Sequence, residues 1–140
     1  MSVWLVSIAK DNYKILEYIN FRTIGISDRY NKTLAKVRKG DFVIIYVASK
    51  ISAIAALLKV KAKPYAVRKS IWLDNFYNTI DVEPIQILKE SDWIDIRPLV
   101  GKLGFISKKV NWGNYFRLSI RHVEKSDYKI FEKIFMKKFN

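Results

Sequence analysis

Short apolar runs, dense in β-branched residues, constrain the fold of this chain more than any other feature of its sequence. Three of them are Val3 to Ala9, Phe42 to Val47 and Ile51 to Lys61. Continuous apolar runs of this length are typical of buried strands. The late part of the third run alternates Leu58 and Val60 with lysines, which predicts a strand with one solvent-exposed, basic face at that point.

Two further segments predict strands of a different kind. Thr79 to Val82 and Ile85 to Leu88 are separated by Pro84, which favours an edge or a bulge because proline has no backbone N–H to donate. The segment Tyr115 to Val123 alternates apolar and polar residues, and it is therefore predicted to form a half-buried strand.

Helices are predicted between and after these strands. Asp11 is expected to cap a helix that ends near Asn20, because its carboxylate can accept from free backbone N–H groups. A short helix is expected from Asn31 to Val37, and one or two helical turns from Arg97 to Leu103. Ser126 is expected to cap a last helix with an apolar stripe. With 140 residues and no Gly-, Pro- or Ser-rich linker, the chain is predicted to form one domain over residues 1–140.

The charge is strongly positive and unevenly placed. Lys and Arg number 26 against 13 Asp and Glu, so the formal net charge is +13. Eleven basic residues lie between Arg29 and Lys69 with Asp41 as the one acidic residue, whereas the segment from Asp74 to Arg97 has six acidic and two basic residues. We therefore expect one positive face and a polyanionic partner, with nucleic acid favoured over an acidic membrane.

The sequence lacks the patterns of the common catalytic and metal sites. It has no cysteine, no glycine-rich phosphate loop, no His-Glu-x-x-His and no Gly-x-Ser-x-Gly. The one histidine, His122, has no partners for a zinc site, and Asp92 with Asp95 fits a solvated edge better than an acid–base pair. We therefore predict a protein that is not an enzyme and that needs no metal and no cofactor.

The amino-terminal segment predicts neither a signal peptide nor a membrane helix. It is apolar only as far as Ala9, and it has no basic lead. Because a chain without cysteine has no need of oxidising conditions, the expected location is the cytoplasm, with no membrane partner.

Trp112 differs in its context from the other three tryptophans. Lys108 and Lys109 precede it, and Gly113 and Asn114 follow it, in a polar and basic loop. A tryptophan exposed in such a loop is costly unless it contacts a partner, so we expect this ring to stack on a base.

Two tracts and the order of the segments that follow them carry a family resemblance. The tract Asn20 to Ser27 contains Ile24-Gly25-Ile26, and the tract Arg29 to Val47 combines a basic stretch, the turn Lys39-Gly40-Asp41 and a strand with Tyr46. In this order the chain resembles EVE-domain proteins of the archaeal UPF0310 type. The resemblance continues through Leu103 to Ile106, Lys108 and Lys109, Trp112, Arg117 to Ile120, and Asp127 with Tyr128.

This resemblance implies an α+β, PUA-like fold. Such a fold is a curled mixed sheet that approaches a small barrel, with helices packed outside it. The resemblance also implies a relation to the YTH domains, which bind methylated adenine. It also implies binding of RNA or DNA, with an unpaired or flipped base, plain or modified, held in a pocket. Ile24 stands where the family usually has tryptophan. An aliphatic wall lacks the π face that favours a methylated ring, so only a weak preference for a modified base is expected.

By this resemblance the functional residues fall into two groups. The base pocket is expected to comprise Ile24, Gly25, Ile26, Tyr46, Trp112, Arg117 and Ser119. The phosphate-binding residues are expected to be Arg29, Lys32, Lys36, Arg38, Lys39, Lys108 and Lys109.

Two other functions remain open at this point. Relatives on PUA-like scaffolds include amidohydrolases that act on modified cytidine, and Lys32 beside Thr33 could supply an amine and a hydroxyl for a small nucleoside-processing enzyme. The basic face could instead bind an acidic protein or lipid surface, although no basic amphipathic helix with a broad apolar face supports the lipid version.

Overall fold

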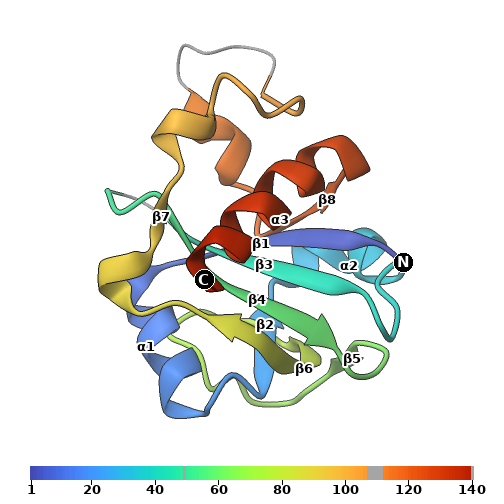
Figure 1. Cartoon of the computed structure of the whole chain (residues 1–140). Coiled ribbons are helices and arrows are strands. Elements are labelled where there is room, and N and C mark those ends of the chain that lie inside the picture. Colours follow the sequence, from blue (N-terminus) through green and yellow to red (C-terminus); the bar gives the residue numbers. More distant parts are fainter. Residues whose placement is uncertain (49, 107–111, 140) are drawn as a thin grey trace.

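The computed structural model describes residues 1–48, 50–106 and 112–139, with side chains as far as residue 135. A mixed sheet forms a curled half-barrel, with helices packed outside it (Figure 1). The strands are β1 (Val3–Ile8), β2 (Thr23–Ile26), β3 (Phe42–Val47), β4 (Ala53–Val60), β5 (Tyr65–Ala66), β6 (Asn78–Ile87), β7 (Ile94–Asp95) and β8 (Ile120–Val123). The helices are α1 (Lys10–Tyr18), α2 (Asn31–Leu34) and α3 (Lys125–Phe139), with short 3₁₀ turns η1 (Asp28–Tyr30), η2 (Glu90–Asp92), η3 (Arg97–Leu99) and η4 (Trp112–Phe116).

The sheet has the strand order β2-β6-β4-β3-β1-β8, with β5 paired to β6 and β7 paired to β4. The neighbours β1 and β3 are parallel, and the other pairs are antiparallel. The predicted strands at 3–9, 42–47 and 51–61 are confirmed as β1, β3 and β4. Pro84 lies within one continuous strand, β6, at the point where the pairing with β4 shifts register, so the predicted bulge is also confirmed.

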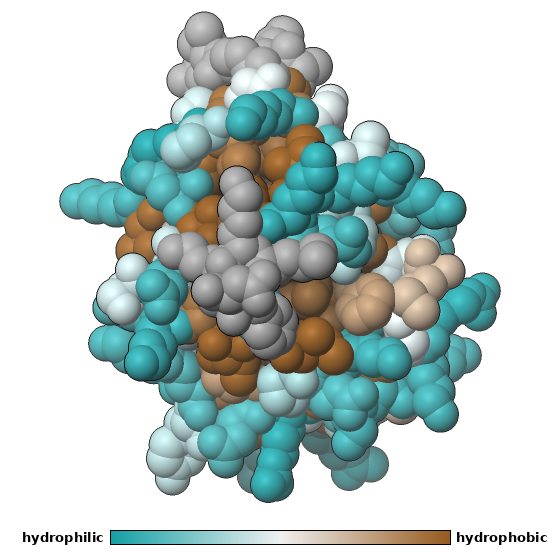
Figure 2. Space-filling view, in the orientation of Figure 1, coloured by the Kyte–Doolittle hydropathy of each residue, from teal (hydrophilic) through white to brown (hydrophobic). Residues whose placement is uncertain are grey.

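The central strands are buried on both faces, which explains their continuous apolar sequences. On one face Trp4, Val6 and Val43 belong to a core that includes Leu16 of α1. On the other face Leu5, Ile44 and Ile54 pack with Phe131 and Phe135 of α3. Figure 2 shows hydrophilic residues around the periphery of the molecule and apolar residues gathered in the middle, beside α3.

Three sequence-based expectations are wrong in detail. The strand predicted over 115–123 begins only at Ile120, because the chain before it forms the η4 turn, from which Phe116 is turned into the core. Asp11 lies in the first turn of α1 and not at its cap, which is Ala9. Ser126 lies inside α3, which begins at Lys125.

The Asp41 carboxylate joins three segments at the end of the sheet where β1 begins. It is 4% exposed, and it accepts hydrogen bonds from the Ser2 N–H (3.0 Å), the Trp4 indole N–H (3.0 Å) and the Arg38 N–H (2.9 Å). Burial alone would raise the pKa of Asp41, but the donated hydrogen bonds outweigh burial and hold it below its ordinary value of 3.8. The preceding residue, Gly40, has φ +93°, which favours glycine and completes the predicted turn.

A second close contact joins β2 to the connection between β5 and β6. The indole of Trp72 lies directly on the backbone of Gly25, so a Cβ added at Gly25 would overlap the ring. Trp72 is 8% exposed and belongs to the same core as Ile24 and Ile26. Gly25 is therefore required for the close approach of a large side chain from a distant part of the sequence.

We predict that Asp41→Asn lowers the free energy of unfolding by about 2 kcal/mol or more at pH 7, because buried donors lose a charged acceptor. Since the folded state lowers the pKa of Asp41, its contribution is complete above the unfolded value of 3.8 and is lost as the pH falls through the lower folded value. Urea denaturation at pH 7 and at pH 3 measures both effects. The difference between wild type and variant should shrink in acid, and an equal difference at the two pH values would contradict this role of the carboxylate.

We predict that Gly25→Ala destabilises the fold by about 1–3 kcal/mol, because the added methyl forces the Trp72 ring out of its place. Thermal unfolding measures the loss, and a red shift of tryptophan emission reports the displaced ring. Gly101→Ala is the matched control, since a Cβ there meets nothing within 4 Å. Equal melting temperatures for the two variants would show that the Trp72 contact does not need glycine.

Candidate nucleic-acid interface

A cleft of about 580 Å³ opens where the parallel neighbours β1 and β3 end. Ligands commonly bind at the carboxyl ends of neighbouring parallel strands, where the chains diverge into loops. The cleft lies between these strand ends, the turn that precedes β4, and the segment that leads from η4 into β8. Its lining residues are Ser7, Ile8, Ala9, Tyr46, Ala48, Ser52, Gly113, Asn114, Phe116, Arg117 and Ser119.

The wall formed by the η4 segment is fixed to the strands by specific contacts. The rings of Tyr46 and Phe116 are stacked, with centroids 4.4 Å apart and an interplanar angle of 22°. The Ser7 hydroxyl donates to the Phe116 carbonyl at 2.7 Å, and the Ser7 N–H donates to the Ser119 carbonyl at 3.0 Å. The cleft is therefore bounded by side chains and backbone whose positions are set before any ligand binds.

The polar groups of the cleft suit a ligand that offers both donors and acceptors. Burial raises the pKa of Tyr46 more than the hydrogen bond with Ser52 lowers it, so the phenol keeps its proton at neutral pH. Ser52 itself is 6% exposed and has a left-handed φ of 48°, a conformation that is strained for serine. Arg117 is exposed, and none of the lining residues is acidic. The cleft therefore combines hydroxyl groups with one guanidinium group.

The structure brings together three of the seven residues predicted for the base pocket. Tyr46, Arg117 and Ser119 line the cleft. Trp112 is half-buried beside it, and its ring contacts Phe116 edge-on at 6.0 Å. Trp112 does not line the cleft itself, so the stacking of its ring on a base stays a prediction.

The structure separates the predicted residues of β2 from this cleft. Ile24 and Ile26 are 0% exposed in the core, and Gly25 is covered by Trp72. Strand β2 ends the sheet at the edge opposite β8, three strands away from β3. The structure therefore does not bring these three residues together with Tyr46, and the side chains of Ile24 and Ile26 are used in packing.

Sequence reasoning missed several lining residues that carried a detectable signal. Ser7 is a polar residue inside the apolar run of β1, and its two hydrogen bonds, to Phe116 and Ser119, help to fix the wall formed by the η4 segment. Asn114 follows Trp112-Gly113 in a segment that was predicted to be polar. Ser52 gave no comparable signal, because its left-handed conformation depends on the turn before β4.

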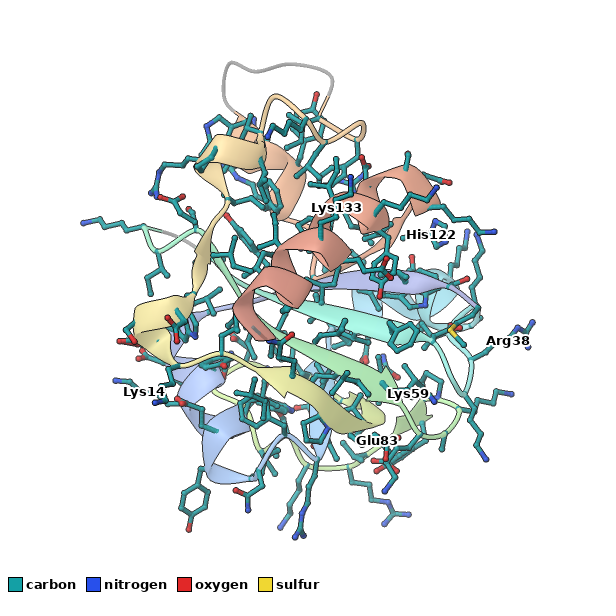
Figure 3. The ribbon with its side chains drawn as sticks, viewed as in Figure 1. Lys14, Arg38, Lys59, Glu83, His122 and Lys133 are labelled. Atoms are coloured by element: carbon teal, nitrogen blue, oxygen red, sulfur yellow. The ribbon has the colours of Figure 1, made fainter. Side chains whose placement is uncertain are left out.

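The predicted phosphate-binding residues lie at the other end of β1. Arg29, Lys32, Lys36, Arg38 and Lys39 are all exposed, on η1, α2 and the turn that precedes β3. Figure 3 shows Arg38 and His122 at the side of the molecule where β1 begins. Lys108 and Lys109 lie outside the described residues.

A second pocket, of about 510 Å³, lies beside this cationic group. Thr33 of α2 and Lys36, which follows that helix, line it together with Trp4 and His122, whose rings meet edge-on at 5.2 Å. Leu118 and Ile120 line it as well, whereas their neighbours Arg117 and Ser119 line the cleft. The segment 117–122 therefore connects the two pockets.

The alternative catalytic interpretation gains little from the geometry. Thr33 faces the second pocket, in which no acidic residue is among the lining residues. Within residues 1–48, 50–106 and 112–139, no group of three His, Cys, Asp or Glu side chains could hold a metal ion. Among the helices of that same part of the chain, none has the length and apolar character needed to cross a membrane.

Comparisons with known proteins agree with this architecture. A UPF0310 protein from Pyrococcus abyssi is 26% identical over 147 residues, which cover 96% of this chain and 99% of that protein. The crystal structure of human THYN1 in complex with 5-methylcytosine-containing DNA has a TM-score of 0.64 at 15% identity, and covers 96% of this chain and 97% of that one. The YTH domain of Zygosaccharomyces rouxii MRB1, in complex with N6-methyladenosine RNA, has a TM-score of 0.66 at 12% identity. The match covers 95% of this chain and 86% of that one.

These likenesses show the fold, which is the α+β, PUA-like arrangement that the sequence resemblance implied. Both solved neighbours hold a nucleic acid that carries a modified base. The family model described as the EVE domain matches residues 2–134. Since that match spans nearly the whole sequence, the chain belongs to the EVE domain family.

Proposed function

We propose that this protein is a nucleic-acid-binding module that holds an unpaired or flipped base in the cleft at the carboxyl ends of β1 and β3. The observation that carries this proposal is the gathering of Tyr46, Arg117 and Ser119 in one preformed cleft of a family member with a net charge of +13. A cleft of about 580 Å³ is within the usual range for small-ligand sites.

Each of the three side chains has a role in this proposal. The protonated Tyr46 phenol and the Ser119 hydroxyl offer hydrogen bonds to the edge of a base, which is accessible once the base has left the stack. The Arg117 guanidinium, at the exposed rim, binds the phosphate of the same nucleotide.

The selectivity of this site for a modified base is expected to be weak. Tyr46 and Phe116 are stacked on each other, so these two rings do not face one another across an open space as the walls of an aromatic cage would. A methyl group in an apolar pocket contributes discrimination of about 1–3 kcal/mol at most. RNA and DNA both fit this description of the cleft.

The cationic group at the other end of β1 supplies the sequence-independent part of the affinity. The segment 117–122 leads from the cleft to the pocket that Lys36 lines. A strand bound along this segment would bring its backbone to Lys36 and the neighbouring exposed cations, of which none has an acidic partner among the ion pairs of the described residues. Phosphate contacts of this kind position the ligand, and base contacts give the specificity.

We predict that Arg117→Ala weakens binding to a single-stranded oligonucleotide about tenfold, or about 1.4 kcal/mol, because it removes a charge-assisted contact. Fluorescence anisotropy with a labelled oligonucleotide measures the dissociation constant. Lys133→Ala, which removes one positive charge from the exposed surface of α3, is the matched control and should change affinity less than twofold or so. Equal losses of affinity in the two variants would mean that Arg117 acts only through the net charge, and they would reject the cleft as the binding site.

We predict that the double variant Lys36→Glu with Arg38→Glu lowers the salt dependence of binding. Each neutralised phosphate of a single strand contributes about 0.7 to the slope of log K against log salt concentration, so losing two contacts should reduce the slope by about 1.4. Titrations between low and physiological salt give the slope for each protein. An unchanged slope would mean that the phosphates are bound on another surface.

A further inference from the structure

The connection between β5 and β6 exposes two aliphatic side chains that the proposed cleft does not use. Ile71 is 55% exposed and Leu73 is 70% exposed, whereas Trp72 between them is 8% exposed. The chain therefore alternates here, with one large side chain directed inward and its two neighbours directed outward. Two exposed aliphatic side chains two residues apart on one loop are a candidate surface for contact with a partner.

These two side chains are held on a rigid support. The Ser70 hydroxyl accepts from the N–H of Trp72 (3.1 Å) and donates to the Asp74 carbonyl (2.7 Å). The Leu73 N–H donates to the side-chain Oδ1 of Asn12 at 2.9 Å, and the side-chain Nδ2 of Asn12 donates to the Asp74 carboxylate at 2.8 Å. Asn12 is 2% exposed, so the support is anchored in the core of the protein. The aliphatic side chains are therefore presented at little further cost in conformational entropy.

The charge around this loop indicates the chemistry of the partner. In this connection the exposed cations Arg68 and Lys69 precede the two aliphatic residues, and the exposed Asp74, whose carboxylate accepts from Asn12, follows them. A partner that satisfies both cations and adjacent aliphatic side chains must present negative charge outside and apolar surface inside. Stacked nucleic-acid bases between two phosphate backbones have this arrangement.

The loop also lies close to the cleft. Asn12, which binds Leu73, is in the first turn of α1, and Ala9, which precedes that helix, lines the cleft. Three residues of an α-helix span about 4.5 Å along its axis. The support of Leu73 is therefore within about one helical turn of the cleft rim.

We propose that Ile71 and Leu73 form an apolar wedge that enters the base stack of a duplex next to the base taken into the cleft. This inference rests on the proposed function. Extruding a base leaves a gap in the stack and costs a few kcal/mol, and apolar side chains inserted between base steps are a known way of supporting such a distortion. A single strand has no continuous stack to fill, so the wedge contributes to duplex binding alone.

The test compares two forms of one DNA sequence: a duplex with a single central mismatch, and the mismatched strand alone. Leu73→Ala should weaken duplex binding about tenfold while changing single-strand binding less than about twofold. Ile85→Ala is the matched control, since Ile85 is also an exposed aliphatic residue, 42% exposed on β6. Both substitutions are at exposed positions, and equal melting temperatures with wild type verify that the fold is intact.

The possible outcomes separate the wedge from the proposed function. If the wild type binds neither form of the DNA, the proposed function fails, and the wedge fails with it. If the wild type binds both forms but Leu73→Ala weakens both equally or neither, the cleft remains and the wedge is rejected. If Leu73→Ala instead abolishes binding to anionic phosphatidylserine vesicles and leaves duplex binding unchanged, the loop is a lipid contact and the wedge is likewise rejected.

Discussion

The burial of β1, β3 and β4 on both faces is the constraint on which the rest of this structure depends. Val43 and Ile45 pack on one side and Ile44 on the other, so neither face of the central sheet is free to bind a ligand. Binding is therefore restricted to the ends of the strands and to the connections between them. The cleft at the ends of β1 and β3, the cations of α2 and the apolar loop before β6 are all located in such places.

Asp41 holds the backbone at the cationic end of the molecule. Its carboxylate binds the Arg38 N–H and the Trp4 indole, so the turn that carries Arg38 and Lys39 is attached to the first strand of the sheet. The side chains of that turn are exposed, whereas its backbone is held by the hydrogen bond from the Arg38 N–H to Asp41. A carboxylate within a basic segment thus holds cations in place through backbone donors and not through ion pairs.

The sequence predicted the central strands and the turn at Gly40 well, because both follow from local pattern and local conformation. Of the residues expected in the candidate pocket, Tyr46, Arg117 and Ser119 come together in the cleft, whereas Ile24 and Gly25 do not join them. The reason is that nothing near Gly25 in the sequence reveals the Trp72 ring, which arrives from a connection 47 residues later. Alternation over 115–123 was misleading for a similar reason, since the contacts of Phe116 with Tyr46 depend on the tertiary structure.

The separation of the cleft from the cationic group bears on the kind of ligand. The cleft includes Ser7, and the pocket that Lys36 lines includes Ser2 and Trp4, so the cleft and Lys36 are separated by three to five residues of β1, roughly 10–17 Å. A nucleoside or a mononucleotide can occupy one of these places but cannot contact both. An enzyme that processes nucleosides would gain nothing from a cationic group at that distance from the cleft. A polymer gains from both, because it can leave one base in the cleft and carry its phosphates along the segment 117–122 to the cations. The spacing of the two features therefore favours a binding module for a nucleic-acid chain over a site for its monomers.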